Sequence, residues 1–246
     1  MLGQLPDSFT ATVTGAGGGI GRAMLEHLLK SERPGRVIAV SRRHFDHDDA
    51  RCETLRADLT TESGRTALAS AVGGEPIHLL FNAIGMLHDS QRNIGPEKRL
   101  EHLDPEALAT LFHVNAVTPI LVIKALHRSL KGSHPVIAAS LSARVGSIAD
   151  NGFGGWYGYR ASKAAHNQLM RTAAIELKRE NRRAIVLCLH PGTTDTALSK
   201  PFQARVPEGK LFTPDFVAAR LTDVMSKRRP EESGSFWDWA GKPVPW

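Results

Sequence analysis

The 246-residue sequence has little cysteine, few aromatic residues and no long apolar run. Its two cysteines, Cys52 and Cys188, lie far apart and lack CxxC spacing, which argues against a disulfide framework and against a zinc site. Among the eleven histidines there is no HExxH or other tight ligand pair, so we predict no metal site. The sequence has no run of about 18 apolar residues, and its first residues lack the regions of a secretory signal. We therefore expect a cytoplasmic protein without membrane contact.

The formal net charge of +6 raises the question of a nucleic-acid partner. The basic residues are scattered in short groups such as Arg182-Arg183, and aromatic residues make up only 6% of the chain. A nucleic-acid surface would need a basic stripe with interleaved aromatic residues, so we predict no nucleic-acid partner. The alternative, a basic nucleic-acid-binding protein, rests on the net charge alone. Positive charge equally suits an enzyme whose ligand carries several phosphates.

Short apolar runs rich in β-branched residues alternate with segments of helical periodicity along the whole chain. The predicted strands span 9–14, 36–41, 52–57, 77–82, 135–140, 184–190 and 235–240. One predicted helix directly follows the first strand, and the others span 62–72, 105–128, 157–181 and 214–227. Asp104-Pro105 and Thr213-Pro214 supply helix start signals, with a capping side chain before a proline in the first turn.

This alternation predicts an α/β fold, a doubly wound Rossmann fold whose seven-stranded, mostly parallel sheet carries helices on both faces. No linker or repeat divides the chain, so we expect one domain over 1–246. Ligands of such sheets lie beyond the carboxyl ends of the strands, where functional residues should therefore gather. The long connections 83–103 and 191–212 are predicted to be active-site loops.

A glycine cluster follows the first strand and opens the first helix. Its residues are Thr14, Gly15, Ala16, Gly17, Gly18, Gly19, Ile20 and Gly21. Glycines let backbone approach a ligand closely, and free N–H groups at a helix start attract a pyrophosphate. The alternative is a tight strand-to-helix turn without a ligand, and the position after the first strand favours the phosphate site.

The second strand ends in Ser41-Arg42-Arg43. In a dinucleotide-binding fold that is specific for NAD(H), an acidic residue at this position binds the free 2′-hydroxyl of the adenosine ribose. Two guanidiniums in place of that acid favour a 2′-phosphate, and hence NADP(H) over NAD(H). The alternative is a solvated basic turn. Asp58-Leu59, after the third strand, could accept from the adenine amino group, although Asp58 could equally cap the next helix.

Tyr159 and Lys163 lie four residues apart, on one face of a predicted helix. Hydride transfer to a carbonyl also needs a proton, and a phenol with a pKa near 10 is a poor donor-acceptor at neutral pH. A nearby ammonium and a positive nicotinamide would stabilise the phenolate, and a shift to about 7–8 requires roughly 3–4 kcal/mol. By itself such a pair is usually structural.

These motifs together resemble the short-chain dehydrogenase/reductase family, in the order TGxxxGxG, NNAG-like element, active-site Asn and Ser, YxxxK and PG. Details of the sequence are most similar to its C-factor and sniffer-like carbonyl reductase branch. The resemblance covers nearly the whole chain and implies a carbonyl or alcohol substrate, with Tyr159 as general acid/base and Lys163 as its assistant. It adds the cofactor-binding residues Asn82, Ala83, Gly85, Pro191, Gly192, Thr194 and Thr196, besides Tyr159 and Lys163.

The resemblance assigns Asn115 to a water that links Lys163 to solvent. At the catalytic serine position the sequence has Ala143, with Ser142 one residue earlier, so we predict that Ser142 serves and keep Ser140 and Ser147 as alternatives. The resemblance to this family also implies a homodimer or homotetramer that assembles through the helices at 105–128 and 157–181. The rival interpretation is a dinucleotide-binding signalling or interaction protein of C-factor type, with weak or absent turnover.

Overall fold

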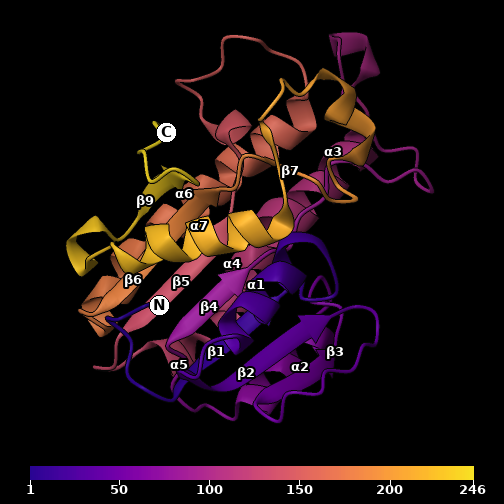
Figure 1. Ribbon diagram of the computed structural model, residues 1–246. Coiled ribbons are helices and arrows are strands. Elements are labelled where there is room, and N and C mark those ends of the chain that lie inside the picture. The colour runs from indigo at the N-terminus through magenta and orange to yellow at the C-terminus, as the bar shows by residue number, and fades with distance from the viewer.

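Seven strands of the chain pair side by side in the order β3-β2-β1-β4-β5-β6-β9, and every neighbouring pair is parallel. The computed structural model describes residues 1–246 (Figure 1). The strands are β1 (Phe9–Thr14), β2 (Pro34–Ser41), β3 (Cys52–Arg56), β4 (Leu79–Asn82), β5 (Val136–Leu141), β6 (Ala184–His190) and β9 (Ser235–Asp238). The predicted doubly wound fold is confirmed, and the sheet is parallel throughout.

Helices cover both faces of this sheet and divide the apolar core into two layers (Figure 1). One layer packs under α1 (Gly19–Leu29) and α7 (Pro214–Ser226), through side chains such as Met24 and Leu221. The other packs under α2 (Glu62–Val72), α4 (Thr118–Ala125) and α6 (Tyr157–Glu180). Alternate residues of each strand serve the two layers, because successive side chains of a strand point to opposite faces.

The predicted long helix at 105–128 is present as a helical stretch over Pro105–Ala125, but it is not a regular α-helix throughout. It consists of α3 (Pro105–Phe112), the π-helical turn η2 (His113–Val117), α4 and the short α5 (His127–Leu130). Pro119 has no N–H to donate to the carbonyl four residues earlier, that of Asn115, so the regular ladder cannot continue there. The hydroxyl of Thr118 donates to the His113 carbonyl at 2.8 Å and helps to close the wider turn. Such π turns are frequent at functional sites.

The start signals of two helices are confirmed. The Asp104 carboxylate accepts from the Ala107 N–H at 2.6 Å, at the start of α3. The Thr213 hydroxyl accepts from the Phe216 N–H at 3.2 Å, at the start of α7. Capping side chains of this kind satisfy one of the free N–H groups at a helix start.

The two long connections contain structure that the sequence pattern did not predict. The first holds an antiparallel bridge between Asp89 and Ile94 and the turn η1 (Leu100–His102). The second holds the parallel pair β7 (Thr193–Thr194) and β8 (Leu211–Phe212), with the 3-10 helix η4 (Lys200–Arg205) between them. We call residues 195–210 the lid, because η4 lies over the large cavity described below.

One helical stretch, Pro105–Ala125, is long and apolar enough to cross a membrane by length and composition alone. A core helix passes the same test, and this stretch packs against α2 and α6 with Leu111 and Val122 buried. It is therefore one of the helices that cover the sheet.

Candidate active site

The glycine-rich turn between β1 and α1 is so tightly packed that several of its positions have no room for a side chain. A Cβ on Gly21 would lie 2.2 Å from the Gly15 carbonyl oxygen, and one on Gly17 would lie 2.2 Å from the Ser41 hydroxyl. Gly15 and Gly19 also have positive φ angles of 74° and 53°. No side chain caps the start of α1, so its first N–H groups have no side-chain partner there. This arrangement suits a phosphate group held by backbone N–H groups.

The predicted 2′-phosphate corner lies beside this turn. Ser41 is buried and its hydroxyl accepts from the Arg43 N–H at 3.2 Å, while Arg42 and Arg43 are exposed. Neither guanidinium is used in an ion pair or a side-chain hydrogen bond of the chain. Both are therefore available to an anion.

Asp58 lies across the same hollow and orders the turn before α2. Its carboxylate accepts from the Thr60 N–H at 3.0 Å and from the Thr60 hydroxyl at 2.7 Å. The capping residue of α2 is Thr61, whose hydroxyl accepts from the Gly64 N–H at 3.1 Å. Asp58 and Leu59 both line the hollow, and the predicted contact with adenine stays a prediction.

Two adjoining cavities run along the carboxyl ends of the strands. The smaller, about 200 Å³, is bounded by the glycine turn, Arg42, Arg43 and the segment from Asp58 to Thr60. The larger, about 1220 Å³, extends from Gly18 to Tyr159 and under the lid. The glycine turn, the free cations and this volume fit a nicotinamide dinucleotide with a substrate beside it.

Asn82 ties three strand ends together below the cavity. Its amide nitrogen donates to the Ser140 hydroxyl at 2.7 Å, and its oxygen accepts from the Thr14 hydroxyl at 2.6 Å. Ala83 and Gly85 follow it in the cavity wall, and a Cβ on Gly85 would lie 3.5 Å from the Lys163 ammonium. The NNAG-like element thus holds the ends of β1, β4 and β5 in register.

Tyr159 and Lys163 lie together in the first turns of α6, and both are almost fully buried. The Lys163 ammonium lies 5.9 Å from the centre of the Tyr159 ring and donates to the Leu141 carbonyl at 2.9 Å. Burial lowers the pKa of Lys163 to about 8. Burial also raises the pKa of Tyr159 well above its usual range, because a charged phenolate is poorly solvated there. The chain alone therefore keeps the phenol protonated, and the lowered pKa expected from the sequence does not arise from Lys163 by itself.

Asn115 is fully buried in the π turn and clamps the loop after β4. Its oxygen accepts from the Met86 N–H at 2.7 Å, and its nitrogen donates to the Met86 carbonyl at 2.8 Å and to the Ser162 hydroxyl at 3.0 Å. The Ser162 hydroxyl in turn donates to the Tyr159 carbonyl at 2.9 Å. Asn115 thus links this loop to α6, and its role toward a water stays a prediction.

The three candidate serines are all bound to other groups of the chain. The Ser142 hydroxyl donates to the Asn167 amide oxygen at 2.6 Å, although Ser142 and Ala143 both line the large cavity. The Ser140 hydroxyl accepts from Asn82, and that of Ser147 accepts from the Asp150 N–H at 3.1 Å. A catalytic role for Ser142 would need its hydroxyl to turn away from Asn167.

Glu97 is a site residue that the sequence pattern gave no signal for. It is 5% exposed, and both of its carboxylate oxygens accept from the Gly158 N–H at 3.2 Å. Its carbonyl accepts from the Trp156 N–H at 2.6 Å. The start of α6 is therefore capped by a residue from the distant β4–α3 loop, and a negative charge there also complements the helix dipole.

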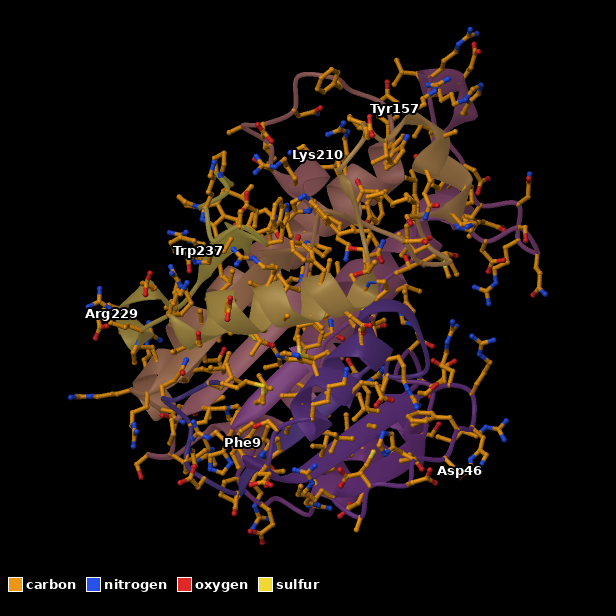
Figure 2. All side chains as sticks on the ribbon, viewed as in Figure 1. Phe9, Asp46, Tyr157, Lys210, Arg229 and Trp237 are labelled. Atoms are coloured by element: carbon orange, nitrogen blue, oxygen red, sulfur yellow. The ribbon has the colours of Figure 1, made fainter.

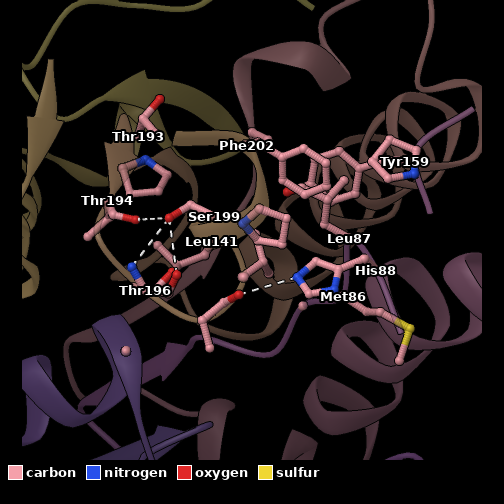
Figure 3. Close-up of a pocket in the computed structure, with 18 of the residues that line it drawn as sticks. Met86, Leu87, His88, Leu141, Tyr159, Thr193, Thr194, Thr196, Ser199 and Phe202 are labelled. Atoms are coloured by element: carbon pink, nitrogen blue, oxygen red, sulfur yellow. Dashed lines mark hydrogen bonds between the residues drawn. The ribbon is translucent and has the colours of Figure 1, made fainter. Parts of the chain in front are cut away.

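Aromatic side chains from three segments form a chain of ring contacts that ends at Tyr159, and Figure 3 labels Phe202, His88 and Tyr159 among them. Trp156 has an unusual positive φ of 54°, and its ring lies 6.2 Å from that of Tyr159 and 5.3 Å from that of Phe202 in the lid. His88 lies 5.8 Å from Phe202 and bonds the Ala197 carbonyl at 3.3 Å. Backbone in this region of φ is costly for a bulky residue and is typical of functional sites.

The segment after β6 forms the wall next to the lid. Gly192 has a φ of 74°, and a Cβ there would lie 2.8 Å from Phe212. The carbonyls of Thr194 and Thr196 both accept from the Ser199 hydroxyl, which fastens the lid to this wall. Pro191, Gly192, Thr194 and Thr196 all line the large cavity, as their predicted role requires.

His190, at the end of β6, also lines the large cavity. Its Nδ1 accepts from the Arg144 N–H at 3.2 Å. Burial, with the Arg144 charge nearby, lowers the pKa of His190 to about 4, so the ring is neutral at physiological pH. The Arg144 guanidinium is held by Asp150 and Asp238, each at 3.2 Å.

Comparison with known proteins places this geometry in a family. The chain is 33% identical over 180 residues to the C-signal of Myxococcus xanthus, which covers 73% of this chain and 99% of that protein. It is 29% identical over 243 residues to 1-hydroxy-2-glutathionyl-2-methyl-3-butene dehydrogenase of Rhodococcus sp. (strain AD45), covering 96% and 99% of the two chains. Among solved structures, NADPH-bound carbonyl reductase from chicken fatty liver superposes with a TM-score of 0.86 at 24% identity, covering 100% and 96%. The short chain dehydrogenase profile matches residues 10–206, and the chain belongs to that family.

Proposed function

We propose that the protein is an NADP(H)-dependent oxidoreductase that interconverts a carbonyl compound and an alcohol. The observation that carries the proposal is the pair Tyr159 and Lys163, buried side by side on α6 at one end of a cavity whose other end has the free cations Arg42 and Arg43. A protein that only bound a dinucleotide would have no need for a buried phenol beside an ammonium.

The preference for NADP(H) rests on the basic corner. Arg42 and Arg43 can form charge-assisted hydrogen bonds with a 2′-phosphate, while no carboxylate stands at the end of β2 to bind a free 2′-hydroxyl. The structural relative from chicken fatty liver is a carbonyl reductase with NADPH bound, which supports the same choice. When bound, the nicotinamide supplies or accepts the hydride.

The residues of the chain manage the proton. In the reducing direction the Tyr159 hydroxyl donates a hydrogen bond and then its proton to the substrate oxygen. Because the pKa of Tyr159 is raised by burial, the phenol carries this proton throughout the physiological pH range. Lys163, whose pKa is about 8, stabilises the phenolate that remains. Asn115 binds a water that links Lys163 to solvent, and the proton is resupplied along that route.

The rival interpretation is a signalling or interaction protein, and the similarity to C-signal favours it. Ala143 at the serine position and the bound hydroxyl of Ser142 also favour slow turnover. Against it stand the buried Tyr159 and Lys163, which binding alone does not require. We further propose a cytoplasmic protein that assembles as a homodimer or homotetramer.

The test is NADPH oxidation with a panel of aldehydes, ketones and quinones, with wild type and Tyr159→Phe compared. We expect wild type to turn over at least one class. The variant should bind NADPH equally well and lose about 100-fold or more in kcat, the usual contribution of a general acid. Tight NADPH binding by wild type without turnover of any carbonyl would contradict the proposal.

A further inference from the structure

Three cations in the wall of the large cavity have no partner in the chain. Lys98, Arg205 and Lys210 all line this cavity and are exposed. None of them has a carboxylate oxygen within 4.0 Å or donates a side-chain hydrogen bond. Their charge is therefore available to whatever enters the cavity.

The other charged groups of the cavity are already accounted for. Arg144 is held by Asp150 and Asp238, and Lys163 donates to the Leu141 carbonyl. The one acidic residue in the wall, Asp89, accepts from backbone N–H groups of its own turn and pairs with Arg92. No acid of the cavity wall therefore pairs with the three free cations.

The same two loops that carry these cations also carry the apolar wall around Tyr159. Lys98 follows Glu97, whose hydrogen bonds to Gly158 fix this part of the loop against the catalytic helix. Arg205 ends η4, the helix that brings Phe202 against Trp156. Lys210 lies at the same end of the molecule as Tyr157, the first residue of α6 (Figure 2).

From this juxtaposition we infer that the substrate is a carbonyl compound that also carries a carboxylate. Its carbonyl end meets Tyr159 and the aromatic wall, and its carboxylate lies among Lys98, Arg205 and Lys210. This inference rests on the proposed function and adds the substrate class to it. Because the cations are exposed, their attraction is screened by salt beyond about 8 Å at physiological ionic strength. Preference for the carboxylate should therefore weaken as salt is added.

The cations could instead serve the phosphates of the cofactor, and the experiment separates the two roles. The probes are 4-carboxybenzaldehyde and its neutral methyl ester, which differ in charge at equal reach. We expect wild type to favour the acid by about tenfold in kcat/KM at low salt, a preference worth about 1.4 kcal/mol. The triple variant Lys98→Gln, Arg205→Gln, Lys210→Gln should lose that preference and keep its kcat/KM for the ester and its Kd for NADPH.

Lys178→Gln, an exposed change on α6 outside the cavity, is the matched control and should keep the preference. Equal use of acid and ester by wild type overturns the inference, and so does a triple variant whose loss is in NADPH binding. If neither aldehyde turns over, the wider carbonyl panel decides the proposed function, and calorimetric binding of terephthalate and its dimethyl ester tests the inference by itself. Binding of terephthalate that exceeds that of the ester and depends on the three cations supports it, and equal binding refutes it.

Discussion

The two ends of the large cavity are built in different ways. At the cofactor end the chain offers the backbone of a glycine-rich strand-to-helix turn and the side chains of two consecutive arginines after the next strand. At the catalytic end, side chains from the β4–α3 loop, the start of α6 and the lid converge on Tyr159. The first end depends on local sequence and the second on contacts between distant segments. Changes at the cofactor end should therefore alter NADPH binding, and changes at the catalytic end should alter turnover.

The largest effect at the cofactor end is expected from Gly21→Ala. Its new Cβ would lie 2.2 Å from the Gly15 carbonyl oxygen, so the turn must open. We expect NADPH affinity to fall about 100-fold, and the free energy of unfolding to fall by about 1–3 kcal/mol, as for other overpacked sites. Fluorescence titration and urea denaturation measure the two quantities. Gly3→Ala, which meets no atom within 4 Å, is the control, and wild-type affinity in Gly21→Ala would contradict the backbone account of this end.

Removal of both guanidiniums, Arg42→Ala with Arg43→Ala, comes next. A charge-assisted hydrogen bond contributes about 1.5–3 kcal/mol, so the Kd for NADPH should rise about 10- to 100-fold. The Kd for NADH should stay within about twofold, because NADH has no 2′-phosphate. Arg182→Ala, exposed and outside both cavities, should leave both values unchanged. An equal loss of affinity for NADPH and NADH would mean that Arg42 and Arg43 do not bind the 2′-phosphate.

Glu97 offers the corresponding test at the catalytic end. Glu97→Ala leaves the start of α6 without its cap, and we expect kcat to fall about tenfold while the Kd for NADPH is unchanged. Glu97→Gln keeps an oxygen acceptor and should restore most of kcat. The split between kcat and cofactor binding distinguishes a positioning role from general loss of stability, which thermal unfolding of both variants monitors. If Glu97→Ala lowers NADPH affinity as much as kcat, the two ends are not independent.

The same contrast explains what the sequence could predict. The seven strands, the glycine turn and the Tyr159/Lys163 spacing follow from local patterns, and the doubly wound fold that they predicted is confirmed. The buried contact of Glu97 with Gly158 joins residues 61 positions apart, and nothing in either segment indicates it. The π turn at Asn115 also escaped prediction, because apolar periodicity runs through it even though Pro119 breaks the ladder.

The smallest effect expected concerns His166, three residues after Lys163 on the catalytic helix. Its ring is 1% exposed, neither ring nitrogen has a hydrogen-bond partner in the chain, and burial holds its pKa well below 6.5. Below about pH 6.5 the unfolded chain takes up a proton that the folded ring refuses, so this residue makes stability fall as pH falls. His166→Leu removes the unpartnered nitrogens and should raise the free energy of unfolding at pH 7 by about 1 kcal/mol.

The variant should also flatten the loss of stability between pH 7 and 5, measured by urea denaturation, whereas His44→Leu, an exposed change, should leave it as in wild type. Its kcat should stay within about twofold, because His166 touches neither the phenol nor the cavity wall. A His166→Leu variant that is stable but inactive would mean that this ring takes part in the chemistry. Proton transfer would then depend on a third residue of α6, His166, besides Tyr159 and Lys163.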